Sequence, residues 1–325
     1  MNPAPINHGT VSQPTNPSRR SLLGSGLLLA ALPGGAWAEP PAVGPGEGLL
    51  VARYPESPRD MDVARRFNFP YSLAMLKLAL SKVAEPVQTV SVPTELPQSR
   101  RFISMRDEGT FDVFWAATSK QLERDHLPIR ICLMKGLNGW RIPVVRADQA
   151  DLLAPVRNLR DLQRYRAGQG YHWIDTEILQ AAGIKVEQSS HVERLYGMLA
   201  AHRFDYLPRG LQEVWTELES PQGRSFAADR HLIIRYPNPH YFFVRRARPE
   251  LAALIEQGLE IARRDGSFDE LFYRFNLHPL LRAQLSERRT IELPNPLLPA
   301  ETPLNRKDLW FSAADLKKRR PARQG

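Results

Sequence analysis

The stretch GQGYHWIDTEILQ at residues 168–180 brings two glycines and the rings of Tyr171, His172 and Trp173 to the start of a segment with helical periodicity. Glycine lets a backbone turn sharply, and the first amides of a helix have no partner within it, so this junction can hold a polar or anionic group. A dinucleotide fingerprint needs a third small residue where Trp173 stands. The stretch therefore predicts one wall of a site for a ligand that is not a nucleotide.

Strand-like and helix-like segments alternate on both sides of this junction. Before it, the pattern predicts strands and helices in turn at 48–55, 71–83, 87–92, 98–109 and 111–117. Around and after it, helices and strands are predicted in turn at 156–164, 165–170, 175–183, 185–189, 192–203 and 204–210. Such alternation is typical of parallel sheets flanked by helices. We expect an α/β protein of two lobes, each a mostly parallel sheet with helices around it.

The last third of the chain adds helices and a proline-rich end. Apolar residues recur at helical spacing in the stretch 251–262, and a further helix is predicted in SFDELFYRF from residue 267. The segment LPNPLLPAETPLNR (293–306) is rich in proline and is expected to lie as a strap on the surface.

The N-terminus has the pattern of an export signal. It carries the twin arginine Arg19 and Arg20, a short apolar run from Leu22 to Leu32, and a small-x-small cleavage motif that ends at Ala38. The apolar run is about half of the ~20 residues that span a bilayer, so we expect no retained membrane anchor. The paired arginines favour twin-arginine (Tat) export over general secretion, although leucine replaces the usual phenylalanine. The prediction is a signal peptide at 1–38, cleaved after Ala38, and a periplasmic protein.

The net charge of +9 does not indicate a nucleic-acid-binding protein. Of the 44 basic residues, two lie in the leader and five in the tail LKKRRPARQG, which leaves 37 basic against 35 acidic residues in the body. No aromatic residue interleaves the charges of the tail, so we expect no nucleic-acid partner. The single cysteine, Cys132, forms no internal disulfide and is expected to be a buried thiol rather than a nucleophile.

Three motifs together resemble the type II periplasmic solute-binding proteins, the exported receptors that include the amino-acid carriers of ABC transporters. They are GTFDVFWAATSKQLERDHLPIRICLMKG (109–136), LRDLQRYRAGQGYHWIDTEIL (159–179) and RPELAALIEQGLEIARRDGSFDELFYRFN (248–276). The resemblance implies a ligand bound in a cleft between the lobes. It also implies the domain bounds: lobe 1 at 48–139 with 246–290, lobe 2 at 147–240, hinge strands at 140–146 and 241–245, and a strap and basic tail at 291–325.

The sequence departs from this family where amino-acid binders hold their ligand. The family arginine of the Thr/Ser-x-x-Arg turn, which binds the carboxylate, is replaced by Leu122, and Arg124 stands two positions later. The family aspartate that pairs with the ligand's ammonium is replaced by Gly210, preceded by Arg209. Both anchors of an α-amino acid are therefore absent or reversed, and we expect an anionic or neutral polar ligand.

The candidate ligand-binding residues follow from this comparison and from strand ends. They are Tyr54, Trp115, Ser119, Arg124, Gly170, Tyr171, His172, Trp173 and Arg209. Two of them have a structural alternative: Trp115 fits the core of an apolar strand, and Arg209 fits a surface ion pair with Glu213 four residues on. His172 and Asp175 have no further histidine or cysteine nearby, so we expect no metal, and no cofactor is predicted.

The function predicted is that of an exported, monomeric, non-enzymatic receptor that delivers a small polar solute to an ABC permease. Two alternatives remain: a solute-sensing module for a membrane signalling partner, and a dehydratase-like enzyme on the same fold. The catalytic signatures GxSxG, HExxH, GxxxxGK[ST] and CxxC do not occur in the sequence.

Overall fold

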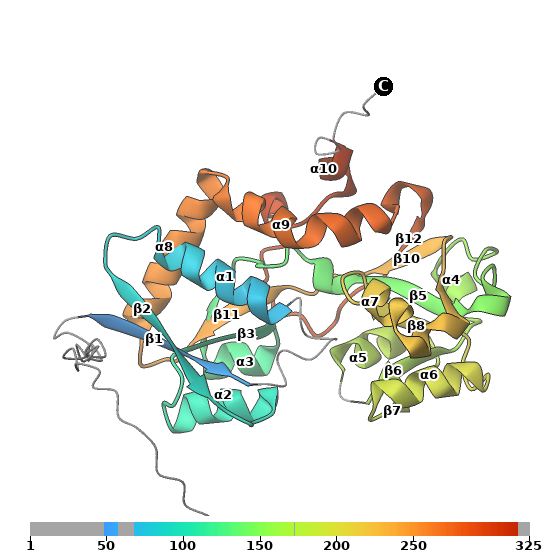
Figure 1. Ribbon diagram of the computed structural model, residues 1–325, viewed down its shortest axis with the longest axis horizontal. Coiled ribbons are helices and arrows are strands. Elements are labelled where there is room, and N and C mark those ends of the chain that lie inside the picture. The colour runs from blue at the N-terminus through green and yellow to red at the C-terminus, as the bar shows by residue number, and fades with distance from the viewer. Residues whose placement is uncertain (1–48, 58–67, 172, 318–325) are drawn as a thin grey trace, which may run out of the picture. The chain divides into compact units, whose positions relative to one another are not determined.

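The computed structural model describes residues 49–57, 68–171 and 173–317. The predicted signal peptide, His172 and most of the basic tail lie outside these residues. Figure 1 shows the strands and helices. The part of the chain built on the first sheet described below is called lobe 1, and the part built on the second sheet is called lobe 2.

Lobe 1 contains five strands and the helices that connect them. In chain order these are β1 (Leu50–Glu56), α1 (Asn68–Leu80), β2 (Val87–Pro93), α2 (Gln98–Asp107), β3 (Val113–Ala117), α3 (Lys120–Asp125), β4 (Leu127–Ile129) and, much later, β11 (His240–Val244). β1 pairs with β2 in parallel, and the amide of Asp112, just before β3, donates to the carbonyl of Arg53 in β1 at 2.8 Å. β11 lies between β3 and β4, antiparallel to both. The strand order is β2-β1-β3-β11-β4.

Lobe 2 repeats this arrangement with a different set of segments. In chain order these are β5 (Trp140–Arg146), α4 (Leu159–Leu162), β6 (Ala167–Gly170), α5 (Ile174–Ala181), β7 (Val186–Ser189), α6 (Val192–Ala200), β8 (Leu207–Gly210), α7 (Val214–Glu219) and β9 (Phe226–Ala228). β6 pairs with β7 in parallel, and a parallel bridge between Ala167 and Tyr206 joins β6 to the start of β8. β5 lies between β8 and β9, antiparallel to both. The order β7-β6-β8-β5-β9 corresponds to that of lobe 1, and the sheet of lobe 2 has two strands more, because β10 (Leu232–Arg235) also pairs with β5 and β12 (Arg289–Glu292) pairs with β10.

The sheet of lobe 1 is completed by a strand from outside its own run of sequence, since β11 follows the whole of lobe 2 and pairs with β3 and β4. In lobe 2 the corresponding strand, β5, is the first strand after the chain leaves lobe 1. The two extended stretches predicted at 140–146 and 241–245 are thus strands β5 and β11. Their action as hinges stays a prediction.

Two long helices pack on lobe 1 as their periodicity predicts. α8 (Pro249–Arg264) buries Leu251, Ile255, Leu259 and Ala262, whose spacing fits one face of a helix. Gly258 on the same face is required for the packing against α1, because a Cβ there would lie 1.9 Å from the carbonyl oxygen of Ala79. α9 (Ser267–Arg282) follows after Gly266.

The chain after α9 reaches the core again. β12 (Arg289–Glu292) pairs in parallel with β10 (Leu232–Arg235), which itself pairs with β5. Residues 293–312, called the strap from here on, run without regular strand structure to α10 (Ala313–Lys317). Leu293 in the segment 293–306 is buried, and after that segment Leu309 and Phe311 are buried too, where the amide of Phe311 donates to the carbonyl of Lys135 at 2.7 Å.

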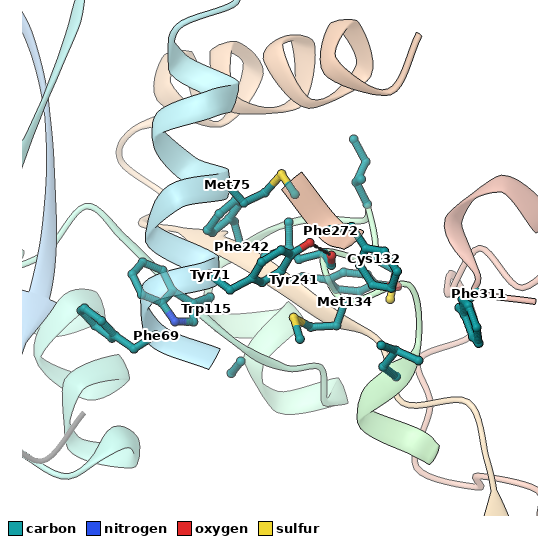
Figure 2. Packing of buried hydrophobic residues seen from close by; sticks show 14 of the residues in the cluster. Phe69, Tyr71, Met75, Trp115, Cys132, Met134, Tyr241, Phe242, Phe272 and Phe311 are labelled. Carbon is teal, nitrogen blue, oxygen red and sulfur yellow. Dashed lines mark hydrogen bonds between the residues drawn. The ribbon is translucent and has the colours of Figure 1, made fainter. Parts of the chain in front are cut away.

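The main core is rich in aromatic rings and includes the cysteine (Figure 2). Phe242 of β11 and Tyr71 of α1 are fully buried in it, and the hydroxyl of Tyr71 donates to the carbonyl of Leu133 at 2.6 Å. Cys132 is also fully buried, and burial raises the pKa of its thiol to about 11. The prediction of a buried thiol is confirmed.

Candidate ligand-binding site

Gly170 lies at the end of β6, where the sequence predicted one wall of the site. The indole of Trp173 lies directly on it, and a Cβ at this position would be 2.4 Å from the ring. The hydroxyl of Thr176 donates to the carbonyl of Gly170 at 2.8 Å, which fixes the first turn of α5 to the strand end. The glycine therefore serves the close approach of Trp173 rather than a phosphate loop.

Arg209 lies next to this wall, at the end of β8, and its guanidinium lies over the Trp173 ring at 4.9 Å from the centroid. Its Nε and Nη2 donate to the two oxygens of Glu217 at 2.7 and 2.5 Å, and Nη2 also contacts Glu213 at 3.1 Å. The residue is only 3% exposed. The alternative of an ion pair with Glu213 is thus present in the structure, but it is buried, and Glu217 is the main partner.

The carboxylate of Glu217 stays charged in this setting. Burial raises its pKa, but the hydrogen bonds from Arg209 and from the hydroxyl of Tyr196, at 2.8 Å, outweigh burial and hold the pKa below its usual value. The pKa of Tyr196 is raised by burial and by the charge of Glu217. Arg209, Glu217 and Tyr196 therefore form one charged, hydrogen-bonded cluster.

A second charged cluster lies beside the first. Arg141 of β5 contacts Asp175 in the first turn of α5 at 2.6 Å and donates from Nε to the hydroxyl of Tyr236 at 2.9 Å. Tyr236, which follows β10, donates to the same carboxylate of Asp175. A Cβ on Gly210 would lie 3.1 Å from both Arg141 Nη1 and Glu213 Oε2, so Gly210 leaves room for these two side chains.

Sequence reasoning missed most of this second cluster. In the sequence, Asp175 is notable only as a neighbour of His172, and Arg141 only as part of an extended stretch. Arg141, Asp175 and Tyr236 are far apart in the chain and meet only because β5 lies beside both β8 and β10. The available signal was an arginine that follows Trp140 inside an otherwise apolar strand, WRIPVVR.

The two candidates from β1 and β3 lie in the core of lobe 1. Trp115 is 4% exposed and Tyr54 is 6% exposed, with their ring centroids 6.3 Å apart. Phe69, at the start of α1, lies 5.0 Å from Trp115, and both rings are visible in Figure 2. The structural alternative for Trp115, a core tryptophan, agrees with this burial.

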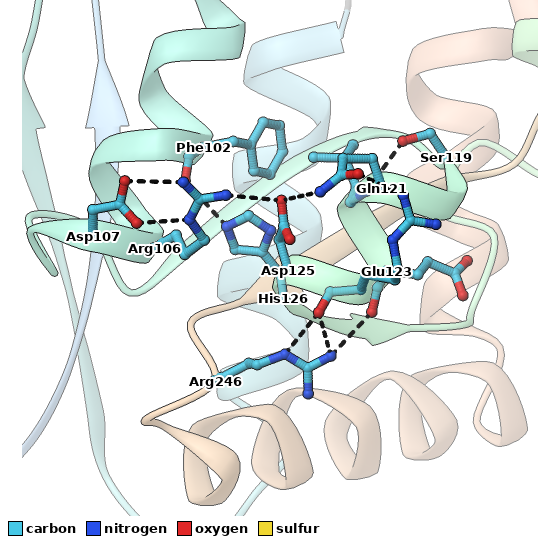
Figure 3. Close-up of polar contacts among 11 residues, drawn as sticks. Phe102, Arg106, Asp107, Ser119, Gln121, Glu123, Asp125, His126 and Arg246 are labelled. Carbon is cyan, nitrogen blue, oxygen red and sulfur yellow. Dashed lines mark hydrogen bonds and ion pairs between the residues drawn. The ribbon is translucent and has the colours of Figure 1, made fainter.

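Figure 3 shows the turn that begins at Ser119, where amino-acid binders of the family carry their arginine and this chain has Leu122. Ser119 caps α3, since its hydroxyl accepts from the amide of Leu122 at 3.2 Å, and Leu122 packs against the core. Arg124 is exposed and donates to the side chain of Gln121 at 2.5 Å. Its carbonyl accepts from Arg246, the residue two positions after β11. Ser119 thus has a structural role as a helix cap, and ligand binding by Arg124 stays a prediction.

Tyr171 is exposed at the end of the segment that follows β6. The residue is 63% exposed, and its backbone amide donates to the carbonyl of Ser189 at the end of β7 at 3.0 Å. In residues 49–57, 68–171 and 173–317, no three His, Cys, Asp or Glu residues lie close enough together to hold a metal ion. No helix within the same ranges is both long and apolar enough to cross a membrane.

The sequence matches no protein-family model and no curated protein. Among solved structures, the probable amino-acid ABC transporter extracellular-binding protein ytmK of Bacillus subtilis is similar with a TM-score of 0.51 and 12% identity, over 70% of this chain and 98% of that chain. An ancestral arginine-binding protein bound to arginine has a TM-score of 0.46 and 14% identity, over 70% of this chain and 98% of that chain. A histidine kinase sensor domain with similarity to periplasmic binding proteins has a TM-score of 0.45 and 16% identity, over 70% of this chain and 95% of that chain.

The similarity to the first of these structures and the repeated strand order agree with each other. The chain has the two-lobed α/β fold of the type II periplasmic binding proteins. The fold class expected from the sequence is confirmed.

Proposed function

We propose that this chain is an exported, monomeric receptor that binds a small polar solute between lobe 1 and lobe 2. One observation carries the proposal: five strands of each lobe pair in the same order, and the chain passes between the lobes before β5 and again before β11. Two connections of this kind allow lobes to close around a ligand, and a ligand that contacts both lobes stabilises the closed state. β5 and β11 would act as the hinges.

The charges at the ends of β6 and β8 favour a neutral polar ligand over an anionic one. Arg209 and Arg141 are each paired with buried or nearly buried carboxylates of the protein itself. A ligand carboxylate would have to displace Glu217 from Arg209, which would leave a buried charge without its partner. A neutral ligand can instead accept or donate hydrogen bonds at the edge of these clusters and lie against Trp173 or Tyr171.

Delivery to an ABC permease fits this function, and a membrane sensor is the alternative partner. Both partners would act on the same closed, ligand-bound form, so the binding step is tested first. Export is tested by the mass of the mature protein, which should begin after Ala38.

The experiment is a thermal unfolding screen with neutral amides, small sugars, organic acids and amino acids. A ligand at 100 times its dissociation constant adds about 2.7 kcal/mol of stability, which raises the Tm by roughly 5 °C. We expect a shift for one class of neutral polar compound, and a smaller radius of gyration in solution scattering with that compound. A shift without compaction, or no shift with any class, contradicts the proposal.

The screen is repeated with two exposed-residue variants. Tyr171→Ala should weaken binding of the compound found, because its ring lies at the predicted wall. Ile103→Ala, at a 40% exposed position of α2, is the matched control and should bind as the wild type does.

A further inference from the structure

A pocket of about 430 Å³ lies where the strap passes the segments that join the two lobes. Its lining comes from the turn after β4, from the start of β5, from the end of β10 and from the strap. This volume is within the range of small-molecule sites in proteins. The candidate site described above shares only Tyr236 with this pocket, through a hydroxyl that is already bound to Asp175.

The walls of the pocket are aromatic and held in place. Trp140 and Phe311 are in edge-to-face contact, with centroids 5.4 Å apart. Trp310 packs on Gly136 so closely that a Cβ there would lie 2.5 Å from its ring, and its indole nitrogen donates to the carbonyl of Pro303 at 3.0 Å. Leu304, also in the lining, is 52% exposed and leaves apolar surface open to solvent. A flat apolar molecule fits such walls.

Three cations line the pocket, and two of them are already paired. Lys135 contacts Asp269 at 2.7 Å, and Arg235 contacts Glu292 at 2.7 Å. Lys307 has no ion pair and no side-chain hydrogen bond within the part of the chain that the structure describes, although it is exposed beside the pocket. The neighbouring acid, Asp308, is bound to Arg306 at 3.1 Å and to Arg263, so it does not neutralise Lys307.

We propose that this pocket is a second binding site, for a small planar aromatic carboxylate with a single negative charge. The ring of the ligand lies against Trp310 and Leu304, beside the Arg235 guanidinium that covers the Trp140 ring at 5.1 Å from its centroid, and its carboxylate pairs with Lys307. We expect a single negative charge on the ligand because Asp269 already neutralises Lys135 and Glu292 already neutralises Arg235. Lys307 alone is then left to pair with the ligand. The inference goes beyond the proposed receptor function, since it assigns a different site and a different class of ligand.

The test uses 2-naphthoate as the probe and titration calorimetry on the whole mature chain at low salt. We expect measurable binding of 2-naphthoate and at least tenfold weaker binding of the neutral 2-naphthamide, which has the same ring system. Lys307→Glu should weaken 2-naphthoate about tenfold or more, as expected when an attractive charge becomes repulsive. Leu304→Ala should weaken both compounds, because it removes apolar contact area.

Lys185→Glu is the matched control, since this exposed lysine precedes β7 and lies outside the pocket lining. It makes the same change in net charge and should leave the affinity unchanged. The proposal is overturned if 2-naphthoate does not bind at millimolar concentration, or if 2-naphthamide binds equally well. It is also overturned if Lys307→Glu and Lys185→Glu weaken binding to the same extent, because the charge effect would then not be local.

Discussion

Lobe 1 and lobe 2 have the same order of strands but fill the corresponding space with different chemistry. Between β1 and β3, lobe 1 places the rings of Tyr54 and Trp115, both buried. At the ends of β6 and β8, lobe 2 places Arg209 with the carboxylates of Glu217 and Glu213. The difference shows that a repeated topology fixes where strands end without fixing what their side chains do there. The lobes should therefore respond differently to matched substitutions.

The largest effect is expected from the aromatic side of this comparison. Trp115→Ala should lower the free energy of unfolding by about 4 kcal/mol, because it leaves a cavity among Phe69, Phe114 and Phe242. The matched change in lobe 2, Trp173→Ala, removes a half-buried ring and should cost about 2 kcal/mol. Urea denaturation of both variants measures the difference. Equal losses would show that the two rings contribute alike and would remove the contrast.

The charged side is tested by Glu217→Gln, which keeps the shape of the side chain and removes its charge. Arg209 would lose its main partner while still buried, so we expect a loss of about 3 kcal/mol in urea denaturation. Glu219→Gln is the control, because this exposed carboxylate pairs with Arg282 on the surface and should cost less than about 1 kcal/mol. A loss at Glu217 no larger than at Glu219 would mean that the buried cluster does not stabilise lobe 2.

The two crossing strands differ in their titratable groups, which predicts a pH dependence for lobe 1. His240 of β11 is buried, with Nδ1 3.1 Å from the side-chain nitrogen of Asn138, and burial lowers the pKa of the imidazole to about 4. The unfolded chain, with an ordinary histidine pKa near 6.5, binds more protons between pH 6.5 and 4. Stability therefore falls as the pH falls through this window, by about 3 kcal/mol from this group.

The measurement compares wild type, His240→Asn and His191→Asn by urea denaturation at several pH values. His240→Asn should flatten the profile between pH 6.5 and 4, whereas the exposed His191 should leave it unchanged. Parallel profiles for the wild type and His240→Asn would show that another group causes the acid sensitivity.

The smallest effect concerns the glycine that ends β6. Gly170→Ala forces the Trp173 ring to shift, since the new Cβ would lie 2.4 Å from it, and should cost about 2 kcal/mol. Gly197→Ala in α6 is the control with the opposite sign, because nothing lies within 4 Å of its Cβ position. Alanine is the better helix former, so this variant should gain about 0.5 to 1 kcal/mol. Thermal or urea unfolding that shows both changes with the same sign would contradict the packing argument.

The sequence predicted the fold more completely than the site. Alternating periodicity placed β1 to β3, β6 to β8 and the helices between them within a few residues, and α8 buries Leu251 and Ile255 as expected. The short strands β4, β9, β10 and β12 were not predicted, because three or four residues are too few to show a period. The cluster of Arg141, Asp175 and Tyr236 could not be predicted, since it depends on which strands become neighbours. The burial of Phe311, which follows the proline-rich segment 293–306, could not be predicted either, because the short stretch around it shows no period and only the structure shows what it contacts.

The positions of β5 and β11 in the sequence also decide when the strands of each lobe can pair during synthesis. Strand β5 is made before its partners β8 and β9, so these three strands can pair once β9 has left the ribosome, before β10 and β12 join the sheet. Lobe 1 has to wait for residues 240–244, and until then β3 and β4 lack the strand that lies between them. Two strand edges on an apolar sheet are exposed throughout that interval, which is where a nascent chain is open to mispairing. A nascent chain that has emerged only up to residue 239 should therefore carry paired β5, β8 and β9 but a chaperone-dependent lobe 1.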